Sequence, residues 1–125
     1  MKIFNFQKGK AGEGLARDFL SKNGYQILKS NFQNRFGEID LVASKDKILV
    51  FVEVKLKIGE QFGLPEEMIT PGKIRQIEQT AQVFLQQNLA LAKAYLQYRI
   101  DAVCIVLDEN QNVKRINHYE NISPL

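Results

Sequence analysis

A chain of 125 residues has the length of one domain with a single modest core, and we predict one domain over residues 1–125. Its composition, 45% hydrophobic and 25% charged, excludes a disordered polymer and is typical of a folded soluble protein. Seventeen basic against fourteen acidic residues leave a net charge of +3, which suits a polyanionic partner but equally an ordinary mixed surface.

The first predicted element is a helix over Lys8–Asn23, in which apolar residues recur at helical spacing until Gly24 ends it. Gly9, Gly12 and Gly14 weaken its first turns, because glycine costs about 1 kcal/mol against alanine inside a helix. Close approach of the backbone to another surface is one reason for such glycines.

Three strands are predicted next, over Tyr25–Asn31, Glu38–Ala43 and Ile48–Lys57. The last two, joined by a polar turn at residues 44–47, should pair antiparallel. Strand alternation places the side chains of the middle strand on two faces, Ile39, Leu41 and Ala43 on one and Glu38, Asp40 and Val42 on the other.

A loop over residues 59–70 leads to the second helix. This helix begins with Thr70 as its N-cap and Pro71 in the first helical position, and it continues with a break through Leu89 to Leu96. Its apolar residues recur as one buried stripe, and its glutamines occupy the wet side.

Two strands complete the order α, β, β, β, α, β, β, over Arg99–Leu107 and Val113–Tyr119. The first is almost wholly apolar, so it lies inside the sheet, and Cys104 within it is most simply a small core residue. His118 has no partner at zinc spacing and is predicted to be a strand residue with an ordinary hydrogen bond. This order predicts an α/β fold with a mixed central sheet flanked by helices.

No segment is suited to a membrane or to secretion. The longest apolar run, Ile48 to Val52, is far shorter than the roughly 20 residues of a spanning helix. No apolar segment accompanies the lysines of the first ten residues, and the single cysteine forms no internal disulfide. We expect a cytoplasmic protein without membrane contact.

Charged residues interrupt the predicted sheet at one place. Glu53 and Lys55 stand two positions apart in an apolar strand, so they point to the same face. Buried charges are disfavoured unless they are paired or bound to a metal. Asp40, on the preceding strand, falls roughly opposite the Phe51 to Glu53 region, within reach of a cross-strand neighbour. Two carboxylates and one amine therefore converge.

Such a group is suited to Mg²⁺ or Mn²⁺, because hard cations prefer oxygen and commonly take one or two carboxylates. Asp40 and Glu53 could supply them, with the Val54 carbonyl as an additional ligand. Lys55 could then orient or deprotonate an attacking water, or stabilise negative charge in the transition state. The alternative is a structural ion pair of Lys55 with Glu53 or Asp40, and the bare triplet does not distinguish the two.

Several cations are candidates for phosphate contact. Lys73 and Arg75 stand in the opening turn of the second helix, where backbone N–H groups also favour anions. Arg35 precedes the acidic strand, and Lys45 and Lys47 occupy the hairpin turn. A solvated surface explains the helix and hairpin residues equally well.

The charged strand and its surroundings resemble the bacterial UPF0102 (YraN-like) family. The resemblance covers nearly the whole chain and rests on six segments: Arg35–Ala43, Val50–Lys55, Phe62–Glu67, Thr70–Lys73, Arg99–Val103 and Ile116–His118. It implies a restriction-endonuclease-like fold of the PD-(D/E)XK superfamily, related to archaeal Holliday-junction resolvases.

Carried over residue by residue, the resemblance makes Asp40 the motif aspartate, Glu53 the second acid and Lys55 the motif lysine, with Mg²⁺ or Mn²⁺ as the implied cofactor. Glu13 matches an acid in the first helix that completes or orients the metal shell in many relatives. Lys57 stands where members often carry arginine, so charge is kept but bidentate phosphate recognition is lost. Met68 replaces a small residue, which we expect to be a packing change.

The function predicted from these residues is a metal-dependent endonuclease that acts on DNA phosphodiesters, with branched DNA as one candidate substrate. A nucleic-acid-binding module without turnover, and a protein-interaction domain on the same fold, are the alternatives. A homodimer would bring two sites to a junction.

Overall fold

The computed structural model describes residues 5–123, so the predicted domain bounds at residues 1 and 125 lie outside the described residues. In chain order the elements are α1 (Asn5–Lys22), β1 (Gln26–Asn34), β2 (Gly37–Lys45), β3 (Ile48–Ile58), the 3₁₀ helix η1 (Pro65–Met68), α2 (Pro71–Gln87), α3 (Leu89–Ala94), β4 (Gln97–Leu107) and β5 (Val113–Tyr119). Among these described helices none has the length and apolar character needed to cross a membrane.

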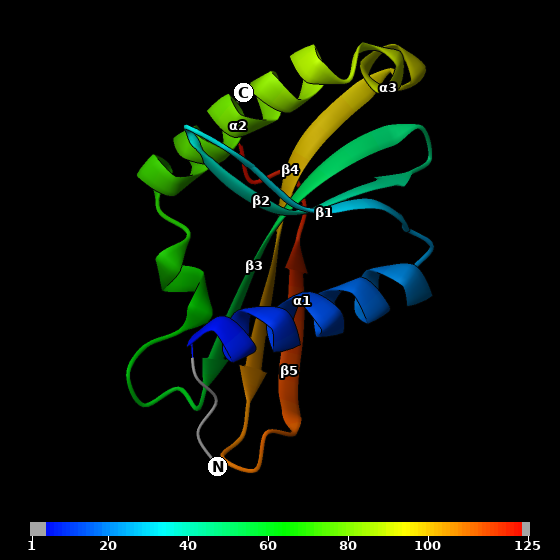
Figure 1. Cartoon of the computed structure of the whole chain (residues 1–125). Helices are drawn as coiled ribbons and strands as arrows, with labels where there is room; N and C mark the ends of the chain where they lie inside the picture. Colours follow the sequence, from blue (N-terminus) through cyan, green and yellow to red (C-terminus); the bar gives the residue numbers. More distant parts are fainter. Residues whose placement is uncertain (1–4, 124–125) are drawn as a thin grey trace.

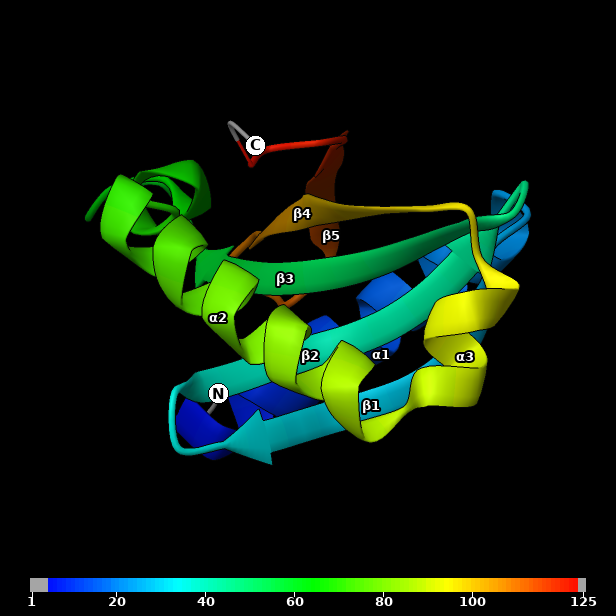
Figure 2. The ribbon, with the colours of Figure 1, turned by 90° about the horizontal axis from the view of Figure 1, so that it is seen from above.

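The strands of the described chain form one five-stranded sheet in the order β1-β2-β3-β4-β5. Only β3 and β4 run parallel, because α2 and α3 connect them, and the other neighbours are antiparallel. Helix α1 covers one face of the sheet, and α2 with α3 covers the other (Figures 1 and 2). The predicted mixed α/β sheet flanked by helices is confirmed.

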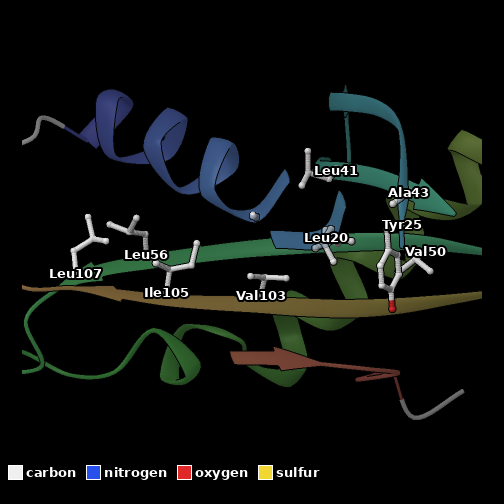
Figure 3. Packing of buried hydrophobic residues seen from close by; sticks show 11 residues of the cluster. Leu20, Tyr25, Leu41, Ala43, Val50, Leu56, Val103, Ile105 and Leu107 are labelled. Atoms are coloured by element: carbon white, nitrogen blue, oxygen red, sulfur yellow. The ribbon is translucent and has the colours of Figure 1, made fainter. Parts of the chain in front are cut away.

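The core has two parts, one under each helical layer. Leu20 of α1 packs with Leu41, Val50 and Val103 of three successive strands (Figure 3). Phe84 of α2 packs edge-on against both Phe32 and Phe51, at 5.0 and 5.6 Å between ring centroids. Because both faces are covered, the central strands β3 and β4 are apolar almost throughout, and charged residues within them stand out.

Gly12 explains part of the glycine content of α1. A Cβ atom there would lie 3.3 Å from the Leu56 Cβ and 3.5 Å from a Val54 methyl group, so the helix backbone approaches β3 closely. Gly9 and Gly14 have open space instead. The predicted close approach is therefore confirmed for one of the three glycines.

One predicted face is wrong in β2. Ile39 packs with Val42 in the core part beneath α2, whereas Leu41 and Ala43 pack in the part beneath α1. The change of side falls where the ladder with β3 ends, because the residues before Leu41 are no longer paired with β3. In the neighbouring β1, Asn31 has φ +56°, and that strand nevertheless continues to Asn34 through its pairing with β2.

Candidate active site

Asp40 and Glu53 lie where β2 and β3 separate. Leu41 and Val52 form the last pair of this ladder. Asp40 precedes Leu41 and Glu53 follows Val52, so both acids lie just beyond the end of the ladder. The Val54 N–H, which has no strand partner on this side, donates to Asp40 Oδ2 at 2.7 Å. The carboxylate therefore replaces the missing backbone acceptor, and the predicted cross-strand position of Asp40 is confirmed.

Glu53 is almost fully buried, at 3% exposure, yet two ammonium groups reach it. Its Oε1 lies 3.3 Å from the Lys55 Nζ and 3.8 Å from the Lys73 Nζ. Lys55 shares the strand face of Glu53, and Lys73 comes from the first turn of α2. That turn is held by its cap, because the Lys73 N–H donates to Thr70 Oγ1 at 3.1 Å. The structure thus adds Lys73 to the predicted triplet.

Burial dominates the electrostatics of both acids. Desolvation and the nearby Glu53 charge raise the pKa of Asp40 to about 7, against the smaller opposing effect of the Val54 N–H. Burial also raises the pKa of Glu53, which the charges of Lys73 and Lys55 oppose. Glu38 raises the pKa of both acids as a further nearby negative charge. Both acids therefore take up a proton more readily than ordinary carboxyl groups, mainly because they are buried.

This donor set fits a hard divalent cation. Because N–H and C=O of one strand residue point to the same side, the Val54 carbonyl faces the open side on which its N–H meets Asp40. Asp40, Glu53 and this carbonyl are oxygen donors of the kind that Mg²⁺ takes together with water. Within residues 5–123 no three His, Cys, Asp or Glu side chains form a metal-binding group, so protein side chains would supply only part of the shell.

Glu13 does not join the acids of the site. Its carboxylate lies 3.6 Å from the Arg17 guanidinium, one helical turn away. Helix α1 packs against the side chains of Val54 and Leu56, which point away from the face of Glu53 and Lys55. Its role in a metal shell stays a prediction.

The other predicted cations divide into two groups. Arg35 stands in the turn before β2 with its guanidinium 4.9 Å from the Phe36 ring, and Lys57 and Arg75 line hollows on either side of the site. Lys45 and Lys47 lie at the opposite end of β2 and β3. There the Lys45 Nζ donates to the Asn23 carbonyl at 2.8 Å and stands 5.0 Å from the centroid of the Tyr25 ring. Nucleic-acid contact by these two lysines stays a prediction without support from the site.

Sequence reasoning missed how η1 is held beside the sheet. Glu66 accepts two hydrogen bonds from Arg115 of β5, at 2.7 and 3.0 Å, and a third from the Tyr119 hydroxyl at 2.7 Å. The Arg115 and Tyr119 bonds hold the pKa of Glu66 down at about 2.

Cys104 of the adjacent strand is buried, which raises the pKa of its thiol to about 12 and agrees with its predicted place in the core.

Gln76 of α2 is a second residue that sequence reasoning missed. It packs on the β1–β2 turn so closely that a Cβ atom at Gly37 would lie 2.9 Å from the Gln76 Cγ. Its Oε1 lies 3.5 Å from the Lys73 Nζ. Gly37 belongs to the segment Arg35–Ala43, which carries Asp40. A glycine at this position was the one signal in the sequence that another residue, here Gln76, packs closely against it.

Residues 12–105 match the model of a family described as Uncharacterised protein family UPF0102. The chain belongs to this family. The UPF0102 protein of Caldicellulosiruptor bescii is 48% identical over 111 residues, covering 89% of this chain and 92% of that protein. That of Syntrophomonas wolfei is 39% identical over 117 residues, covering 94% and 97%. The resemblance is confirmed, and the matched UPF0102 segment contains all four residues of the site: Asp40, Glu53, Lys55 and Lys73.

Proposed function

We propose that this UPF0102 protein is a metal-dependent endonuclease of the PD-(D/E)XK type that hydrolyses DNA phosphodiesters. The observation that carries the proposal is the convergence of Asp40, Glu53 and Lys55 where β2 leaves β3. Acids of this kind, buried in an otherwise apolar sheet and raised in pKa, are typical of functional sites. Lys73 adds a second positive charge for a phosphate.

In this proposal Asp40, Glu53 and the Val54 carbonyl hold Mg²⁺ or Mn²⁺. When bound, such a cation lowers the pKa of its water and offsets charge on the phosphate. Lys55 orients the attacking water or donates a hydrogen bond to a phosphate oxygen, since its ammonium is tethered at 3.3 Å from Glu53 and partly exposed. Lys73 approaches the same carboxylate from α2 and binds the phosphate from that side.

The direct test is cleavage of linear, flapped and four-way DNA with Mg²⁺, with Mn²⁺ or with EDTA. We expect cleavage only with metal, and a decrease of at least about 100-fold in Glu53→Gln and Lys55→Ala, the scale of a lost catalytic group. Lys93→Ala is the matched control, because this lysine is exposed on α3 and no contact with nucleic acid is predicted for it. Cleavage that persists unchanged in both site variants would exclude this site.

One observation favours a second candidate, a nucleic-acid-binding module without turnover. Two ammonium groups already lie near Glu53, and in the described part of the chain no third acid completes a metal-binding group. This candidate predicts salt-sensitive DNA binding, because neutralised phosphates release counterions. It also predicts no cleavage with any metal, and a weaker affinity in Lys73→Ala.

A further inference from the structure

Two hollows flank the candidate site and meet at one residue, Met68 of η1. The first, of about 440 Å³, runs along β3 and α1 and is lined by Lys55, Lys57, Val54, Gly12 and Met68. The second, of about 620 Å³, lies over the first turns of α2 and is lined by Lys73, Arg75, Gln76, Phe36 and Met68. Both are open depressions of the surface and not enclosed cavities, so an extended chain could lie across them.

Both hollows carry positive charge. Each contains one lysine that contacts Glu53, Lys55 in the first hollow and Lys73 in the second. Each also contains a further cation, Lys57 or Arg75. A strand of nucleic acid carries a phosphate at every nucleotide, so a polyanion passing from one hollow to the other would meet cations on both sides of Glu53.

Met68 is held at the boundary between the hollows and its side chain is exposed. It is 43% exposed, although it is apolar and lies next to charged groups. Its helix η1 is fastened to β5 by the hydrogen bonds of Glu66, and it packs beside β3 and β4 with Pro65 buried. Met68 lines both hollows, because η1 leaves it partly exposed at the surface. The expectation that it is a packing change relative to a small residue stays a prediction.

We propose that Met68 is a substrate-contacting residue that presses against the nucleotide beside the reacting phosphate. The inference rests on the proposed function, and it names the substrate class: DNA whose bases are unpaired or unstacked at that point, such as a flap or fork. Apolar side chains inserted at a base step must unstack it, which costs a few kcal/mol. That cost is least where pairing is already interrupted. Continuous duplex is accordingly the poorer substrate.

The first experiment measures contact and does not depend on turnover. Met68 is the only methionine in residues 5–123, and trypsin releases it in the peptide Ile58–Lys73. The rate of its oxidation to the sulfoxide by dilute peroxide is followed by mass spectrometry in EDTA. We expect saturating flapped DNA to slow oxidation several-fold and duplex DNA of equal length to slow it less. Equal rates with and without flapped DNA would overturn the inference.

The second experiment measures specificity as the ratio of affinities for flapped and duplex DNA. Met68→Ala should lower this ratio about tenfold, the scale of one lost insertion contact, while Met68→Leu should keep it because size and apolar character remain. Phe62→Ala is the matched control, since Phe62 is 88% exposed in the same β3–α2 connection but lines neither hollow. An unchanged ratio in Met68→Ala overturns the inference.

The two proposals fail separately. Protection of Met68 by flapped DNA without cleavage under any metal would support the contact and reject the nuclease. Cleavage abolished by Glu53→Gln, with Met68→Ala cutting flapped and duplex DNA in the wild-type ratio, would support the nuclease and reject the contact. Protection of Met68 by an RNA or a protein but not by DNA would reject the substrate class named here.

Discussion

Among single residues, Asp40 has the largest consequence for the response to pH. Its pKa is about 7 in the folded protein against 3.8 for an ordinary aspartate, because burial and the Glu53 charge disfavour its ionised form. Between about pH 4 and pH 7 the folded chain therefore keeps a proton that the unfolded chain has released. The free energy of unfolding decreases as the pH rises through this window.

Asp40→Asn should remove the free-energy cost of ionising a buried carboxyl group at high pH, and it should keep an oxygen acceptor for the Val54 N–H. We expect the variant to melt above wild type at pH 8, with a much smaller difference at pH 4, in thermal unfolding with EDTA present. Asp18→Asn, at an exposed position of α1, is the control and should shift both melting temperatures equally. If Asp40→Asn destabilised the protein by the same amount at both pH values, the raised pKa of Asp40 would be contradicted.

The same carboxyl group links metal binding to pH. A cation must displace the proton of Asp40, so the affinity for Mn²⁺ should increase about tenfold from pH 6 to pH 8 for a group that titrates near 7. Calorimetric titration measures it, with Asp40→Ala as the variant that should bind no ion at this site. Identical affinities at pH 6 and pH 8 would argue against Asp40 as a ligand.

The residue types in the sequence were enough to identify the two acids of the site. They did not show which of the lysines contact these acids. Glu53 and Lys55 could be identified because they interrupt an apolar strand, where charge is unusual. Lys73 and Lys45 looked alike as lysines beside a turn. One reaches Glu53 and the other binds the Asn23 carbonyl, and both contacts depend on how distant segments pack.

At the level of elements, η1 depends on a partner strand for its position. Four residues of 3₁₀ helix have little stability of their own. The bonds from Arg115 and Tyr119 to Glu66 supply it, and they place Met68 beside the site. This is why the segment looked like a plain loop in the sequence: its partners follow 49 and 53 positions later.

Glu66→Gln should therefore lower the free energy of unfolding by about 1–2 kcal/mol near neutral pH, since charge-assisted hydrogen bonds are replaced by neutral ones. The loss should shrink as the pH falls from about 4.5 towards 2, where the wild-type carboxylate takes up its proton. Urea unfolding at several pH values checks both. Glu67→Gln is the control, because Glu67 accepts one bond from the Leu64 N–H and should matter less.

At the scale of the whole molecule, a buried carboxylate on the face opposite the site joins β4 to β5 and to the segment that follows β5. Asp101 is 0% exposed and accepts bonds from Arg99 at 2.9 and 3.1 Å, from the Asn121 N–H at 2.9 Å, and shares a 2.8 Å contact with the His118 Nε2. These partners lower the pKa of Asp101 despite its burial. Arg99 also donates to the Tyr25 hydroxyl at 2.7 Å, which ties β4 to the residue just before β1.

Asp101→Asn should destabilise the protein by about 3 kcal/mol, because it leaves the Arg99 charge without its buried partner. Glu120→Gln changes the exposed partner of the same arginine and should cost less than about 1 kcal/mol. Urea unfolding at pH 7 measures both. Equal effects of the two variants would mean that burial adds nothing to the Asp101 pair.

The sequence by itself determined the order of the two long helices and the five strands, the capped start of α2, and the strands that carry Asp40, Glu53 and Lys55. Periodicity, capping and charge within an apolar strand act over a few neighbouring residues, so they can be read locally. Only the tertiary structure decided that β2 leaves β3 at Asp40, that Lys73 meets Glu53, that Glu13 stays with Arg17, and that Met68 faces outward. Those outcomes depend on contacts between residues far apart in the chain, where many partners compete for each side chain and packing selects one.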